Sequence, residues 1–215
     1  MNSVILGSSS KGNSVLYGNI LVDCGVPYAK IKPYADVIEF VLLTHKHDDH
    51  FNRSSMVKLA VHNPNIRWIC CEWLKQDLLN MGILNVTVVE LNSVLQIKIE
   101  PFVIVSPFIL YHDAPNCGWR IMVDKFKIFH ATDTNTLEGI SARGYDLYAI
   151  EHNYDEDTIH DLIREKKELG QFSYEEGAIN SHLSFQQAAQ FIKENATKEH
   201  IVLKLHISSR YKGEI

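Results

Sequence analysis

The stretch Thr44-His45-Lys46-His47-Asp48-Asp49-His50 places three imidazoles and two carboxylates within six positions of one another. It follows the apolar run Phe40–Leu43, which indicates a buried strand, and precedes Ser54–His62, whose apolar spacing predicts a helix. A protein core does not bury so many polar groups without partners, and a solvated loop has no need of three histidines. Neutral imidazole nitrogens and carboxylate oxygens are ligands for zinc and similar divalent ions, so the stretch predicts a metal site.

The spacing of these residues suggests how they are shared between ions. His45 and His47 lie two positions apart, so both rings can point one way from an extended turn. Asp49 and His50 lie further round the loop, where they can serve a second ion. The helical H-E-x-x-H pattern is absent, which excludes a zincin.

The histidine stretch resembles the H-x-H-x-D-H signature of the metallo-β-lactamase superfamily. This resemblance implies an α+β fold, namely a four-layer αββα sandwich of two mixed β-sheets with helices on the outer faces. It also implies that the metals lie at one edge between the sheets. Further ligands are then expected from the ends of later strands.

Candidates for these later ligands occur in the order that the resemblance implies. His112, in Tyr111-His112-Asp113-Ala114, resembles the third histidine of the first metal, and Asp133 resembles the carboxylate that bridges both metals. His182, in His182-Leu183-Ser184, resembles the last histidine of the second metal. The implied ligands of the first ion are His45, His47, His112 and Asp133. Those of the second ion are Asp49, His50, Asp133 and His182.

Several further motifs resemble the YycJ/WalJ-like branch of this superfamily. They are Gly7–Ser14, Val22-Asp23-Cys24-Gly25, His112-Asp113-Ala114, Thr132-Asp133-Thr134, His182-Leu183-Ser184 and His206-Ile207-Ser208. Members of the branch are regarded as nucleases, typically 5′ to 3′ exonucleases on DNA. The resemblance covers nearly the whole chain, motif by motif.

Other residues are candidates for catalysis and substrate binding under the same resemblance. Asp49 and Asp133 are expected to accept or orient the proton of the nucleophile. His206, at the end of the last predicted strand, is expected to contact phosphate or donate a proton; a partly buried structural role is the alternative. The turn Gly7–Asn13 can present backbone N–H groups to a phosphate. The candidate substrate contacts are Ser9, Lys11, Asn13 and His206.

Composition supports one soluble globular domain over residues 1–215. The 215 residues are 46% hydrophobic and 22% charged, with a formal net charge of −5, which excludes a disordered chain. The acidic balance argues against broad electrostatic binding of nucleic acid, although bound metals would add local positive charge. The four cysteines form no C-x-x-C pair, and the N-terminus has no signal-peptide pattern, so we expect a cytoplasmic protein with reduced thiols and no membrane segment.

The remaining pattern alternates strands and helices, with several strands arriving in hairpins. Phe102–Val105 and Ile109–His112 are predicted as two separate strands, and Ile201–Leu205 as the last strand. Glu156–Leu169 is predicted as a charged helix, and the next helix begins only at Ser184.

Three functions compete at this point. The first is a dinuclear metal-dependent hydrolase of phosphodiesters, a nuclease resembling a 5′ to 3′ DNA exonuclease, which uses a metal-bound hydroxide. The second is a metallohydrolase of a small thioester, lactone or cyclic phosphodiester, and the third is a non-catalytic binding module with an inherited metal site. The cofactors are two divalent ions, Zn or Mn, with Fe also compatible with the ligands. The sequence leaves open the metal, the polarity of cleavage and whether a homodimer forms.

Overall fold

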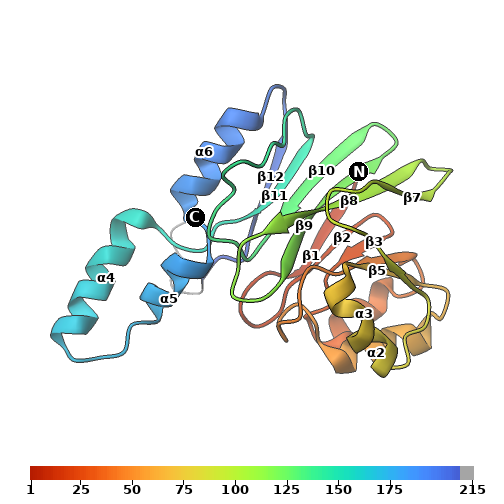
Figure 1. Cartoon of the computed structure of the whole chain (residues 1–215), viewed down its shortest axis with the longest axis horizontal. Helices are drawn as coiled ribbons and strands as arrows, with labels where there is room; N and C mark the ends of the chain where they lie inside the picture. The colour runs from red at the N-terminus through yellow and green to blue at the C-terminus, as the bar shows by residue number, and fades with distance from the viewer. Residues whose placement is uncertain (209–215) are drawn as a thin grey trace.

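The computed structural model describes residues 1–208 and contains two β-sheets that face each other. Helices cover the outer sides of the sheets, as Figure 1 shows for α2 and α3 on one side and α6 on the other. The predicted four-layer α+β sandwich with two mixed sheets is therefore confirmed.

The first sheet has the strand order β1-β2-β3-β4-β5-β6. Its first three strands pair antiparallel, and β3 to β6 pair parallel. The strands are β1 (Ser3–Gly7), β2 (Ser14–Tyr17), β3 (Ile20–Val22), β4 (Phe40–Leu42), β5 (Arg67–Cys70) and β6 (Val86–Val88).

The second sheet has the order β12-β11-β10-β9-β8-β7. Its strands β10, β11 and β12 pair parallel, whereas β7 to β10 pair antiparallel. The strands are β7 (Leu95–Lys98), β8 (Val103–Leu110), β9 (Asn116–Val123), β10 (Phe126–Ala131), β11 (Leu147–Glu151) and β12 (Ile201–Leu205).

The helices fill the connections between strands. Those on the first sheet pack through an apolar cluster that includes Ile31, Met56 and Leu74, and α6 packs on the second sheet through Phe191 and Ile192. The α-helices are α1 (Tyr28–Ile31), α2 (Arg53–His62), α3 (Glu72–Asn80), α4 (Glu156–Glu168), α5 (Tyr174–Ser181) and α6 (Phe185–Asn195), with a 3₁₀ turn at Lys32–Tyr34. The α4 and α5 helices form an arm beside the sandwich (Figure 1).

The core between the sheets fixes the strand that leads into the histidine stretch. Leu42 on β4 and Trp119 on β9 are fully buried in one apolar cluster that draws on both sheets. The indole N–H of Trp119 also donates a hydrogen bond to the Leu43 carbonyl at 3.3 Å. The end of β4 is therefore held against the second sheet just before His45.

The direction of the strands gathers the polar loops at one edge. The parallel pairing of β10, β11 and β12 and the two antiparallel steps from β10 to β8 give all four strands the same direction. Their carboxyl ends therefore meet at one edge of the second sheet, where the chain reaches His112, Asp133, His182 and His206 after β8, β10, α5 and β12.

Two sequence expectations differ from the structure. The two strands predicted around Pro107 are one strand, β8. β7 pairs with β8 only at Val103–Val105, and the Pro107 carbonyl accepts a hydrogen bond from the Asn92 backbone N–H, outside β7. Pro107 therefore lies beyond the part of β8 that pairs with β7, where its missing N–H costs no hydrogen bond to β7. The segment between Leu169 and Ser184, for which no helix was predicted, contains α5.

Within residues 1–208 no helix is long and apolar enough to cross a membrane.

Candidate metal centre

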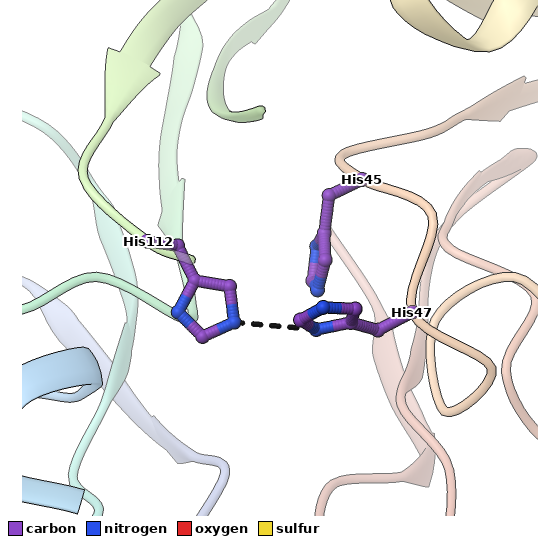
Figure 2. A group of neighbouring side chains, drawn as sticks. All are labelled: His45, His47 and His112. Carbon is purple, nitrogen blue, oxygen red and sulfur yellow. Dashed lines mark hydrogen bonds between the residues drawn. The ribbon is translucent and has the colours of Figure 1, made fainter. Parts of the chain in front are cut away.

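The first group of neighbouring side chains consists of His45, His47 and His112, from both sheets (Figure 2). One ring nitrogen from each lies within 4.8 Å of the others. The His112 Nε2 atom is 3.3 Å from His47 Nδ1, and His112 Nδ1–H donates to the Ser181 carbonyl at 3.1 Å. The His112 ring is thereby oriented with Nε2 toward the two histidines of the first sheet.

A second group lies beside the first and contains Asp49, His50 and His206. His206 Nε2 is 3.5 Å from the Asp49 carboxylate, and the His50 ring is fully buried. This group therefore joins the Thr44–His50 loop to the end of β12.

Asp133 lies between the two groups. Its Oδ2 atom is 2.9 Å from His50 Nε2, and its Oδ1 atom is 3.6 Å from His206 Nε2. Asp133 also joins His45 and His50 in a set of potential ligands that lie within 4.8 Å of one another. The Asp133 carboxylate thus lies close to His45 of the first group and to His50 and His206 of the second. The family resemblance implies such a position for the ligand that bridges the two ions.

His182 and His206 lie together in one set of potential ligands with Asp133 and Glu151, but they differ in their contacts with the histidine loop. His206, and not His182, joins Asp49 and His50. His182 Nδ1 is 3.8 Å from Asp133 and donates a hydrogen bond to the Glu151 carboxylate at 2.5 Å. The buried carboxylate of Glu151 also accepts from His206 Nδ1 at 3.1 Å.

Asp23 supports the histidines from behind and was not singled out as a site residue from the sequence. Its buried carboxylate accepts hydrogen bonds from His50 Nδ1 at 2.7 Å and from the backbone N–H and the hydroxyl of Thr44, both at 2.9 Å. The Thr44 oxygen in turn lies 2.9 Å from His45 Nδ1. These hydrogen bonds place a proton on the Nδ1 atoms of His45 and His50 and leave their Nε2 atoms facing the centre.

The Gly7–Asn13 turn is attached to the same centre. The Asn13 amide nitrogen lies 3.0 Å from the Asp49 carboxylate and 2.8 Å from His50 Nε2, and it also donates to the Ser9 carbonyl. The Ser9 hydroxyl accepts a hydrogen bond from the backbone N–H of Lys11, whose side chain is exposed. Of the predicted substrate contacts, Asn13 and His206 therefore touch the centre directly, and Ser9 and Lys11 lie on the turn around it.

Close backbone packing holds this turn and the histidine loop together. A Cβ atom on Gly25 would overlap the carbonyl oxygen of Asp49. The Gly25 N–H donates to the Asn13 carbonyl, and the Asn13 N–H donates to the Asp49 carbonyl. Only glycine fits at position 25 because the loop approaches so closely.

Backbone strain is concentrated at the centre. Five residues other than glycine have a positive φ within the described part of the chain, and Asp23, Asp133 and His206 are three of them, at 58°, 59° and 51°. This left-handed conformation costs free energy for most residues and is found at functional sites.

The electrostatics of the centre favour a bound cation. Burial lowers the pKa of His45 well below its usual value, so this ring is neutral and able to coordinate. Burial also lowers the pKa of His206, but the nearby carboxylates of Asp133, Asp49 and Glu151 outweigh this effect and raise the pKa to about 10. The carboxylates therefore retain protons on nearby imidazoles, and a metal ion would compete with those protons.

Unpaired nitrogens show that the donor set fits a metal ion. The Nε2 atoms of His45 and His206 are buried and have no hydrogen-bond partner in the described chain. Buried polar atoms nearly always have a partner, so two unpaired nitrogens beside carboxylates indicate that a bound cation is their partner. Imidazole and carboxylate together suit zinc and similar divalent ions.

Several other histidines have ordinary partners. His130 is buried with its Nδ1 atom 2.9 Å from the Tyr17 hydroxyl, and burial lowers its pKa to about 3. His62 on α2 bonds to Tyr28 and Asp36.

Comparison with known proteins places this geometry in a family. The profile of the family described as "Beta-lactamase superfamily domain" matches residues 18–207. A comparison with curated protein sequences gave no match.

Solved structures share the fold at low sequence identity. The metallo-beta-lactamase fold protein YhfI from Bacillus subtilis has 15% identity and a TM-score of 0.75, over 96% of this chain and 86% of that chain. Human tRNase Z, short form, has 19% identity and a TM-score of 0.69, over 99% and 94%. Zn²⁺-bound PqqB from Methylobacterium extorquens has 14% identity and a TM-score of 0.71, over 97% and 89%. At these identities the likeness shows the fold alone.

Proposed function

Because the chain belongs to the beta-lactamase superfamily, we propose that it is a phosphodiesterase that depends on two divalent metal ions. The observation that supports this most strongly is the position of Asp133 between the two groups: it shares a set of potential ligands with His45 of the first group, and it lies 2.9 Å from His50 and 3.6 Å from His206 of the second. Two-metal sites of this kind stabilise the attacking and leaving oxygens of a displacement at phosphorus.

The residues divide between the ions as follows in this proposal. His45, His47, His112 and Asp133 hold the first ion, as predicted from the sequence. Asp49, His50, Asp133 and His206 hold the second. His206 takes the place that the sequence assigned to His182, because His206 Nε2 is buried, unpaired and close to Asp49.

The protein groups then have distinct tasks. When bound, the two ions acidify a water molecule and neutralise the phosphoryl oxygens. Asp49 orients the water molecule. The oxygen of that water forms the new bond to phosphorus while the bond to the leaving oxygen breaks. His182, held by Glu151, donates the proton that the leaving oxygen needs, since its side chain is 17% exposed and lines the hollow beside His206.

Nucleic acid is the substrate that the relatives suggest. Human tRNase Z shares the fold, and the motifs of this chain resemble a branch of 5′ to 3′ DNA exonucleases. Zinc is the metal named for PqqB, and manganese suits the same ligands. Exonuclease action with zinc or manganese is therefore the specific form of the proposal.

Removing the metal tests the proposed function. Treatment of the full chain with a chelator is expected to reduce hydrolysis of bis(4-nitrophenyl) phosphate to background, and Zn²⁺ or Mn²⁺ is expected to restore it. The measurement is the release of 4-nitrophenol, with metal content determined in parallel. Full activity after chelation, or hydrolysis of thioesters and lactones without any phosphodiester, would contradict the proposal.

Replacing His182 and His206 separately tests the exchanged roles. The His206→Ala variant is expected to lose about one metal equivalent per chain, because a ligand of the second ion is gone. The His182→Ala variant is expected to keep both equivalents and to lose about 10² to 10⁴-fold in kcat, the contribution of a general acid. Metal loss in His182→Ala and full occupancy in His206→Ala would reverse the assignment.

The His182→Ala loss should also depend on the leaving group. Because 4-nitrophenolate needs little help from a proton, the loss is expected to be smaller with bis(4-nitrophenyl) phosphate than with an alkyl leaving group. Equal losses with both substrates would argue that His182 acts only structurally.

A further inference from the structure

Gly177 in the middle of α5 has no evident structural requirement. Its backbone is helical, without a positive φ, and a Cβ atom there would meet nothing within 4 Å. Glycine inside a helix costs about 1 kcal/mol relative to alanine, so alanine at position 177 would give a more stable helix. The space that the missing side chain leaves therefore calls for another explanation.

Gly177 borders two hollows beside the candidate metal centre. The first, of about 680 Å³, is lined by residues that include Tyr111, His112, Asp113, Asn135, Gly177 and Ser181. The second, of about 400 Å³, is lined by residues that include Ser10, Tyr174, Gly177, Ser181, His182 and His206. Gly177 and Ser181 border both, so this face of α5 adjoins a hollow at His112 and a hollow at His206.

Each hollow contains one exposed tyrosine. Tyr111 is 51% exposed in the first hollow and Tyr174 is 68% exposed in the second. Exposed aromatic side chains beside a nucleic-acid site act as stacking surfaces for planar rings. A phosphodiester at the metal centre would thus have a stacking surface available on either side.

The charges around the hollows do not suit a long polyanion. Among the described residues that line the two hollows, Asp113 is the only ionic side chain besides histidine, and it is 68% exposed. The arm over residues 156–181 carries seven acidic and three basic side chains. Lys11, exposed and next to Ser10, supplies a single positive charge near the second hollow. Proteins that bind strands neutralise several phosphates with Lys and Arg.

We propose that the substrate is a short phosphodiester with one phosphate between two ring-bearing substituents, such as a dinucleotide. One substituent occupies the hollow at Tyr111 and the other the hollow at Tyr174, with the phosphate between them at the metal centre and both substituents beside Gly177, which borders both hollows. This inference rests on the proposed phosphodiesterase function and replaces its exonuclease form with cleavage of small substrates. Hydrolysis consumes one water and yields one phosphomonoester and one alcohol.

Substrate length gives the first test. With the metal-loaded full chain, we expect kcat/KM for the dinucleotide dTpdT to equal or exceed that for a 20-nucleotide oligothymidylate. A rise from 50 to 200 mM salt should lower the dTpdT value only about threefold, as for one phosphate contact. A tenfold preference for the 20-mer, with a loss of more than about 100-fold over the same salt range, would overturn the inference and leave the phosphodiesterase proposal intact.

Variants of α5 give the second test. Gly177→Phe should raise KM for dTpdT at least tenfold without lowering Tm, because the phenyl ring would fill the space at Gly177, which borders both hollows. The matched variant Glu176→Phe, at an exposed neighbouring position outside both linings, should keep the wild-type KM. An unchanged KM in Gly177→Phe would overturn the inference. Failure of the wild-type protein to cleave dTpdT, the 20-mer and bis(4-nitrophenyl) phosphate would instead overturn the proposed function, and this inference with it.

The tyrosine in the first hollow gives the third test. Tyr111→Ala should raise KM for dTpdT severalfold, and Tyr111→Phe, which keeps the stacking ring, should restore it. Equal KM values for the wild type and Tyr111→Ala would contradict the stacking role.

Discussion

Replacing Asp133 with asparagine is expected to remove metal from the centre and to lower kcat/KM for a phosphodiester at least about 10³-fold, or roughly 4 kcal/mol in activation free energy. The carboxylate is buried and stands between His50 and His206, and it also joins His45 in a set of potential ligands. A neutral carboxamide offers one coordinating oxygen in place of two anionic ones, so it cannot serve both ions in the same way.

Asparagine is the informative substitution at this position. Asp133 has a φ of 59°, a left-handed conformation that asparagine tolerates better than alanine does. The variant therefore removes the charge while it keeps the size and the backbone conformation. The measurements are metal equivalents per chain after desalting and kcat/KM with bis(4-nitrophenyl) phosphate.

A matched control separates this effect from a general loss of charge. Asp161→Asn changes an exposed aspartate on α4, paired only with Arg164 on the surface, and should leave both measurements unchanged. An Asp133→Asn variant that retains two ions and wild-type activity would show that Asp133 does not bridge them.

Asp23→Asn is expected to lower the free energy of unfolding by about 3 to 5 kcal/mol, because it breaks a buried hydrogen-bonded pair between charged or polar groups. The Asp23 carboxylate accepts three hydrogen bonds, from His50 and twice from Thr44. In asparagine one of these oxygens becomes an NH₂ group that faces other donors. The partners would remain buried without an acceptor.

The same substitution should weaken metal binding about 10 to 100-fold, since Asp23 orients His50 directly and His45 through Thr44. Unfolding in urea measures the first effect and titration calorimetry the second. Asp36→Asn is the matched control, because Asp36 is 90% exposed and pairs with His62 on the surface, where a change below about 1 kcal/mol is expected. A stability loss for Asp23→Asn no larger than that of Asp36→Asn would contradict the role of Asp23.

The resemblance of the histidine stretch implied the sandwich, and local signals placed many of its strands. The histidine loop follows a short apolar strand, and β12 begins and ends where the pattern indicated. Such features depend on residues that are near each other along the chain. Where a local signal misled, it was a breaker residue: Pro107 split one predicted strand in two, and Gly177 lies in the helix that was not predicted.

The arrangement of the site was harder to predict because it depends on long-range contacts. His182 follows α5 and His206 follows β12, and both lie at the edge of the second sheet where the site forms. No local sequence pattern indicates which of the two rings reaches Asp49. Glu151 ends a fully buried strand, and only the fold brings it to both histidines. Asp23 lay in a motif that the sequence singled out, but its link to His50 spans 27 positions. The ligand roles themselves stay predictions.

The late position of His206 in the sequence affects the order in which the centre can form. His206 reaches the centre from the end of β12, and its backbone N–H donates a hydrogen bond to the Ser8 hydroxyl, 198 positions earlier in the chain. Contacts between such distant residues form slowly, because a large loop must close before they contribute. During synthesis, His45 and His47 leave the ribosome long before His206 does. In the proposed assignment both ions have two ligands in the Thr44–His50 loop. All ligands of the first ion would be present once Asp133 has been synthesised, whereas those of the second would be complete only after β12 has brought His206 to the centre.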